Sequence, residues 1–242
     1  MLRGMSSAHV ASVNLGAARP TDTNSAGRTG IAKHPVGSVD VRAPGSRHGG
    51  LGSGIVGDFI GDRPDHGGDH QAVYAVAREE LDAWAVELDR DLPAGSFGEN
   101  LTTQDLAVDA AIVGQTWQIG EEVVLRVSGP RIPCRTFAEH MGMPAWVKRF
   151  AQRGRSGAYL SVQEPGTIRP GDPITVLHTP DHGVDVSMTF RAFMGDLETA
   201  QIVLDAGCLD PEADAKLREK VRKRQRADQA QNRGEQVTAT DA

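Results

Sequence analysis

The chain has 242 residues, of which 39% are apolar and 24% charged, a composition that supports a packed core and excludes wholesale disorder. Its formal net charge of −6 argues against a nucleic-acid-binding protein, and no apolar run approaches the roughly 20 residues of a membrane helix. The N-terminal stretch lacks the apolar core of a secretion signal, and the two cysteines are too few for a disulfide framework, so we expect a cytoplasmic protein.

The first third of the chain predicts short strands separated by turns. Residues 9–15 alternate as a half-buried strand does, and residues 20–30 have the Thr, Asn, Ser and Gly content of a loop. Two β-branched stretches, 36–41 and 54–60, are bounded by glycine and proline. The 28 glycines and 13 prolines indicate many turns and short strands.

The middle of the chain adds helices to this strand pattern. Residues 78–88 have apolar side chains at i, i+3, i+4 and i+7, the period of an amphipathic helix, and residues 144–152 predict a second helix. Strands are predicted at 112–119, 122–128, 158–162 and 174–177. The order of these elements favours a mainly β fold, a closed or nearly closed barrel with helical insertions.

After His182 the pattern becomes helical and predicts about three short helices. Residues 187–194 and 196–206 form the first two, and Asp210 followed by Pro211 makes a sound start for the third. These boundaries predict a flexible N-terminus (1–8), a barrel domain (9–182), a helical domain (187–226) and a disordered tail (227–242).

A basic run marks the last predicted helix. Between Lys216 and Arg226, seven basic residues stand against one acidic residue, Glu219. We expect these side chains to face solvent, and docking of an acidic electron-donor protein is the alternative.

The sharpest local feature is the segment SGPRIPCR at 128–135. We expect the strand to end at Ser128, because prolines then fix the backbone and remove amide hydrogens. Cys134 lies between Arg131 and Arg135, and cationic neighbours favour the thiolate, the form that binds metals or attacks electrophiles. A buried structural cysteine is the alternative. Cys208 has no charged neighbour of this kind, and we expect it to be structural.

Two glycine-containing loops supply further candidates. Asn100 follows a tight loop in GSFGENL at 95–101, and its amide suits the edge of a pterin or purine, although an Asx turn is an alternative. In the loop at 61–73, Arg63 and His66 flank a glycine pair, Gly67 and Gly68, which suits a backbone that approaches a phosphate.

A zinc site in the second loop is a weak interpretation. It would use Asp65, His66, Asp69 and His70, but the glycine pair argues against a helix that would align the histidines, and no second cluster supplies further ligands.

Taken in order, these segments resemble the MOSC domain family, named for the molybdenum cofactor sulfurase C-terminal domain, and within it the bacterial YiiM-like branch. The matching pieces are GIAKHPV (30–36), GDR with HGG (61–68), FGENL (97–101), PRIPC (130–134) and GAYLSV (157–162). The resemblance runs from about Val10 to Val176, and the following helices resemble the three-helix domain of this branch.

The resemblance implies a MOSC-type β-barrel that binds the molybdenum cofactor, with Cys134 as the ligand of molybdenum. By their motifs, the expected contacts of the cofactor are Asn100, Arg63, His66, Arg131, Lys33, Gly67 and Gly68. The chain departs from the common family pattern at Asp65, His70 and Gln71, so Asp65 and His70 receive no ligand role. Pyridoxal phosphate is not expected, because the chain is too short to contain that domain of the parent sulfurase.

The reductive branch of the family implies a molybdenum-dependent oxidoreductase. Its substrate would be an N-hydroxylated small molecule, its electrons would come from a separate reductase protein, and His66 would be a catalytic proton donor beside Cys134. The main alternative is a non-catalytic carrier of the cofactor or of its sulfur. A purely structural interaction module is a third hypothesis.

Overall fold

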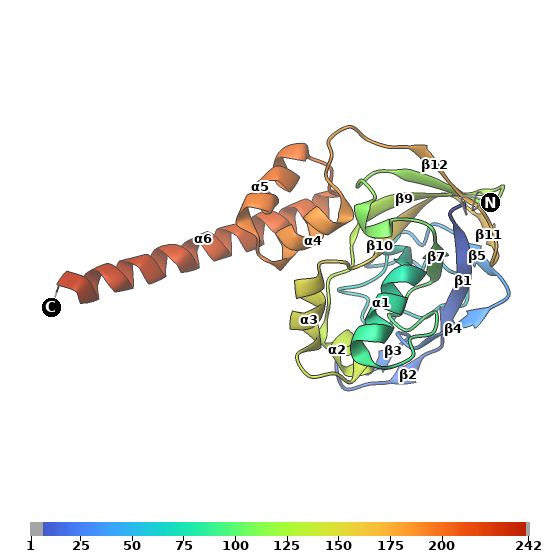
Figure 1. Cartoon of the computed structure of the whole chain (residues 1–242), viewed down its shortest axis with the longest axis horizontal. Coiled ribbons are helices and arrows are strands. Elements are labelled where there is room, and N and C mark those ends of the chain that lie inside the picture. The colour runs from blue at the N-terminus through green and yellow to red at the C-terminus, as the bar shows by residue number, and fades with distance from the viewer. Residues whose placement is uncertain (1–6, 241–242) are drawn as a thin grey trace, which may run out of the picture.

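The computed structural model, which describes residues 7–240, is built around one mixed eight-stranded sheet (Figure 1). Its strands are β1 (His9–Gly16), β4 (Lys33–Val36), β6 (Val73–Ala77), β7 (Leu101–Gln104), β8 (Thr116–Ile119), β9 (Val123–Pro130), β10 (Ala158–Glu164) and β12 (Ile174–His178). They lie in the order β12-β8-β9-β10-β6-β7-β1-β4. All neighbours are antiparallel except β6 and β7, which run parallel.

The sheet does not close into a barrel, which corrects the predicted mainly β barrel. β1 pairs with β4 and β7, and an isolated bridge joins its first residue, His9, to Pro173 just before β12. Backbone hydrogen bonds from Val10 N to Asp172 O, from Gly171 N to Val10 O and from Ile174 N to Ala8 O accompany the bridge, but in the described part of the chain no strand-length ladder joins β1 to β12. Together with the helices, the open sheet makes the fold mixed α/β.

Smaller elements extend the sheet at its margins. Two short pairs are formed by β2 (Arg19–Pro20) with β3 (Arg28–Thr29) and by β5 (Val39–Val41) with β11 (Gly166–Ile168). The predicted loop at 20–30 therefore contains part of a small hairpin. The predicted strand at 54–60 is wrong, because this stretch makes only one isolated bridge, at Ile55.

Three helices pack beside strand β6: α1 (Arg78–Leu88), α2 (Arg135–Met141) and α3 (Trp146–Arg153). The 3-10 turns are η1 (Asp69–Gln71) and η2 (Val108–Ala110). Helix α1 has the bounds predicted from the sequence. Leu81 and Trp84, which belong to its periodic apolar face, are buried. An aromatic cluster holds these helices together: Trp84, Phe97, Phe137, Trp146 and Phe150. A second core of aliphatic side chains and Trp117 fills the curved sheet.

The C-terminal helices are α4 (Val186–Met194), α5 (Leu197–Ala206) and α6 (Pro211–Thr240). Their number agrees with the three helices predicted after His182. Asp185 and Asp196 cap α4 and α5 by accepting backbone N–H hydrogen bonds. Val186 and Phe190 of α4 belong to the two cores of the body, so the first of these helices packs against it.

Helix α6 continues past the residues where the predicted helical domain ends. It runs to Thr240 and extends away from the body (Figure 1). It therefore includes most of the tail predicted at 227–242, of which the last two residues lie outside the described ones. The predicted flexible N-terminus lies outside the described residues up to position 6. Within the described part of the chain, no helix is long and apolar enough to span a membrane.

Candidate functional site

Cys134 lies where the chain leaves the sheet and begins a helix. Strand β9 continues beyond Ser128 as far as Pro130, which pairs with Ala158, so the strand ends later than predicted. Cys134 is the extended N-cap residue of α2, a helix that the sequence analysis missed because only seven residues form it. The thiol thus lies between the end of strand β9 and the start of helix α2.

The surroundings of Cys134 favour its thiolate. Burial by itself raises the pKa of the thiol, but a hydrogen bond from His66 and the positive charge of Arg131 outweigh burial and lower the pKa to about 6. The thiolate therefore predominates at neutral pH. Cys208 differs, since burial raises the pKa of its thiol. The pKa values of the two thiols are thus shifted in opposite directions, and the reactive role of Cys134 and the structural role of Cys208 stay predictions.

The glycine loop brings His66 to the thiol. Gly67 and Gly68 have φ values of 85° and 77°, and a Cβ at Gly67 would lie 2.7 Å from the carbonyl oxygen of Gly52. The amide of Gly67 donates to Gln71 Oε1 at 3.1 Å, and the amide of Gly68 donates to the Gly52 carbonyl at 2.9 Å. These glycines therefore shape the loop, and neither amide is free to bind a phosphate as the sequence suggested.

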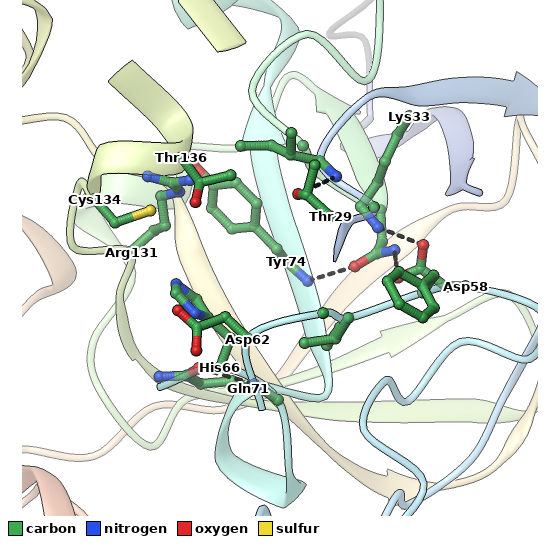
Figure 2. A pocket seen from close by; sticks show the side chains of 18 of the residues that line it. Thr29, Lys33, Asp58, Asp62, His66, Gln71, Tyr74, Arg131, Cys134 and Thr136 are labelled. Atoms are coloured by element: carbon green, nitrogen blue, oxygen red, sulfur yellow. Dashed lines mark hydrogen bonds and ion pairs between the residues drawn. The ribbon is translucent and has the colours of Figure 1, made fainter. Parts of the chain in front are cut away.

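An inner cavity of about 110 Å³ lies beside the thiol, and Figure 2 shows its side chains. Lys33, Asp58, Asp62, His66, Gly67, Gln71, Tyr74, Asn100, Arg131, Cys134, Thr136 and Tyr159 are among the residues that line it. Six of the eight predicted site residues meet here. Gly68 and Arg63 do not line it. Arg63 instead donates a hydrogen bond to the Gly50 carbonyl, so its predicted cofactor contact is not supported.

Asp58, which the sequence analysis missed, organises one end of the inner cavity. Its carboxylate pairs with Lys33 (Figure 2). It also accepts hydrogen bonds from Ser53 Oγ at 2.9 Å and Asn100 Nδ2 at 3.0 Å. The two charged side chains are 1% and 7% exposed. Lys33 therefore has its counter-charge within the protein, rather than on a ligand as predicted.

Asn100 is buried, and its amide is largely committed to the protein. Nδ2 donates to Asp58 and to the carbonyl oxygen of Asn14, and Oδ1 accepts from the backbone N–H of Tyr74 at 3.2 Å. Both N–H donors are therefore used. Asn100 forms part of the cavity wall, but it has little capacity left to read the edge of a pterin.

Arg131 is the cavity residue with unused hydrogen-bonding capacity. It is 5% exposed, and its guanidinium lies over the Phe137 ring at 3.7 Å from the centroid. Among the described residues, its buried Nη1 has no hydrogen-bond partner. A buried guanidinium donor without a partner is costly, so this atom points to an anionic or polar ligand in the cavity.

A second and larger cavity of about 480 Å³, here called the outer cavity, also borders Cys134. It shares Asp62, His66, Gln71, Cys134 and Tyr159 with the inner cavity. Its other lining residues include Asp65, His70 and Ile132, and Phe193, Glu212, Lys216, Glu219, Lys220 and Lys223 from the C-terminal helices. Part of the basic run thus lies beside the site and not only in solvent. The described residues contain no group of three or more His, Cys, Asp or Glu side chains placed to hold a metal ion.

Comparison with known proteins identifies the family. The model of the MOSC domain matches residues 62–175. The uncharacterised protein YflK of Bacillus subtilis is 31% identical over 185 residues, which cover 75% of this chain and 79% of YflK. YiiM of Escherichia coli is 29% identical over 127 residues, 51% of this chain and 56% of YiiM. A Gibberella moniliformis protein named a reductase is 32% identical over 131 residues, which cover 53% of this chain and 23% of that protein.

The fold agrees with this assignment. The crystal structure of YiiM from Geobacillus stearothermophilus matches with a TM-score of 0.68, covering 88% of this chain and 99% of that one at 23% identity. At that identity the likeness concerns the fold alone. From the matched domain, the relatives and the fold, we conclude that the chain belongs to the MOSC domain family and is similar to YiiM proteins in sequence and structure.

Proposed function

We propose that the protein is an oxidoreductase that binds the molybdenum cofactor through Cys134 and reduces N-hydroxylated small molecules with electrons from a separate reductase. The observation that carries this proposal is the low-pKa thiol at the junction of two cavities, beside a buried arginine with an unpartnered donor. The MOSC family is generally linked to this cofactor, and one relative is named a reductase.

The residues of the inner cavity fit such a cofactor. A thiolate is a soft ligand, and Cys134 supplies one at neutral pH without a large cost of deprotonation. Arg131 would hold an anionic or oxygen-bearing group through Nη1, which otherwise remains unsatisfied. When bound, the cofactor would supply the redox centre that accepts oxygen from the substrate and electrons from the reductase.

The protein would manage protons and water around this chemistry. Reducing N–OH to N–H consumes two electrons and two protons and releases water, so a proton donor must reach the substrate oxygen. His66 lines both cavities, as Cys134 does, and its interaction with the thiol helps to lower the pKa of Cys134, so its imidazole is close to the reacting group. We assign the proton transfer to His66. Asp58 has a positioning role, because it holds Asn100 and Lys33 in the wall of the inner cavity.

The test is made on protein produced in a molybdenum-replete host. Molybdenum and pterin are measured per chain, and turnover of N-hydroxylaminopurine is followed with a small-molecule reductant. Wild type and Cys208→Ser should contain the cofactor and turn over, whereas Cys134→Ser should fold but lose activity, because a hydroxyl is a harder and less acidic ligand. Absence of molybdenum from the wild type, or full activity in Cys134→Ser, would overturn the proposal. Bound cofactor without turnover would leave the carrier alternative.

A further inference from the structure

The outer cavity has a loop wall and a helix wall, and each carries groups of both charges. The loop wall contributes Arg47, Asp62 and Asp65 next to His66 and His70, and the helix wall contributes three carboxylates and three lysines: Asp210, Glu212, Glu219, Lys216, Lys220 and Lys223. Its volume of about 480 Å³ falls within the roughly 300–1,000 Å³ of small-molecule sites. The charge that a ligand meets in this cavity therefore depends on which of these groups already have partners within the protein.

The three lysines of the helix wall come from one face of α6. Lys216, Lys220 and Lys223 are spaced four and three residues apart, which places them side by side on a helix. Lys216 pairs with Glu212 at 2.9 Å, and Lys223 pairs with Glu219 at 2.6 Å. These two lysines therefore have carboxylate partners on their own helix.

Lys220 differs from its neighbours. Its Nζ donates to the carbonyl oxygen of Phe193 at 3.1 Å and lies 5.8 Å from the centroid of the Phe193 ring. Within the part of the chain that the structure describes, it has no carboxylate partner. Since an ammonium group carries three donors, Lys220 keeps both charge and donors for a ligand.

An ion pair holds this wall in place. Arg47 donates to Glu212 at 2.8 Å, and its Nε donates to the carbonyl oxygen of Gly67 in the loop that carries His66. At the helix start, the carboxylate of Asp210 accepts from the amides of Glu212 and Ala213, so it is occupied as a cap. The C-terminal helix is thus fastened to the loop beside Cys134.

We propose that the outer cavity binds the substrate, and that Lys220, flanked by Lys216 and Lys223, binds an anionic group of the substrate remote from the reacting nitrogen. This inference rests on the proposed reduction at Cys134. Asp62 and Asp65 on the loop wall repel an anionic end. On the helix wall Glu212 and Glu219 are paired with cations and Lys220 keeps its charge, so the anionic end turns toward α6 and the reacting end toward the thiol. The substrate class is an N-hydroxylated compound that carries a phosphate or a carboxylate.

The experiment compares matched pairs of compounds that differ in one anionic group: N6-hydroxyadenosine with its 5′-monophosphate, and benzamidoxime with 4-carboxybenzamidoxime. Binding is measured by calorimetry on metal-free protein, and KM and kcat on cofactor-loaded protein. At least one anionic member should bind better than its neutral partner. Lys220→Gln should weaken its binding about tenfold and raise its KM by a similar factor with little change in kcat, as loss of one charged hydrogen bond predicts. The neutral member should be unaffected.

Arg222→Gln is the matched control, because Arg222 is on the same helix, is exposed and does not line the outer cavity. Equal binding of both members in both pairs, or equal losses in the Lys220 and Arg222 variants, would overturn the inference. So would a loss of molybdenum or pterin in Lys220→Gln, which would assign the lysines to the cofactor. If the wild type binds the anionic compounds through Lys220 but shows no turnover, the proposed reductase activity fails while the binding site stands.

Discussion

Replacing Asp58 with asparagine is expected to destabilise the wall of the inner cavity. The carboxylate accepts hydrogen bonds from Gly16 N at 2.9 Å, Ser53 Oγ at 2.9 Å and Asn100 Nδ2 at 3.0 Å, and pairs with Lys33. Asparagine keeps the shape but loses the charge, and its amide nitrogen would face groups that are themselves donors.

The magnitude follows from the charge that remains. Lys33 has a side chain only 7% exposed, and in Asp58→Asn it would lose its counter-charge. Removing one partner of a buried pair costs about 3–5 kcal/mol. Since 1 kcal/mol lowers the Tm of a chain of this size by about 2–4 °C, the Tm should fall by roughly 6–20 °C.

Urea and thermal unfolding of the metal-free protein measure this loss. The double variant Lys33→Met, Asp58→Asn should recover part of it, because no buried charge is left unpaired. Asp82→Asn is the control, since the exposed pair of Asp82 with Arg78 should contribute about 0–1 kcal/mol. The reasoning is refuted if Asp58→Asn unfolds within about 1 kcal/mol of the wild type, or if the double variant is no more stable than the single one.

Three further outcomes are expected at other residues. In metal-free Cys208→Ser, alkylation of Cys134 by iodoacetamide should accelerate as pH rises through about 6, and His66→Ala should move this midpoint upward; a midpoint near 8 to 9 in the parent protein would contradict the pKa. Arg131→Met should lower the molybdenum content by more than tenfold (about 1.4 kcal/mol or more) while retaining the fold, and unchanged metal analysis would remove its ligand role. Burial raises the pKa of Glu80 above 4.5 although Arg153 opposes the shift, so its ionisation lowers stability as pH rises through that region; Glu80→Gln should lose this component in unfolding curves from pH 4 to about 7, and parallel curves would count against it.

Local patterns predicted those parts of the fold that local interactions determine. The α1 helix follows from a periodic apolar face, and α5 begins at the aspartate that caps it. His66 and Cys134, which were both predicted as site residues from their motifs, line the same two cavities, and a glycine pair with positive φ shapes the loop that carries His66.

The parts that failed depend on partners distant in sequence. Asp58 carries no local signal, and its role arises only when the fold surrounds it with donors from positions 16, 33, 53 and 100. The pairing with Asp58 also explains why Lys33 was predicted as a cofactor contact. The motif of Lys33 does not show that a carboxylate 25 positions away neutralises its charge. Closure of the sheet likewise depends on whether the first and last strands meet, which no periodicity encodes.

The basic run shows how tertiary placement changes the meaning of a charge pattern. On a helix considered alone, lysines at three- and four-residue spacing form a solvated face, and that was the expectation here. Leu217 is fully buried in the C-terminal core, however, and the ion pair of Glu212 with Arg47 fixes the neighbouring face over the cavity at Cys134. Lys220 consequently lines the cavity while Arg222, two positions later, does not.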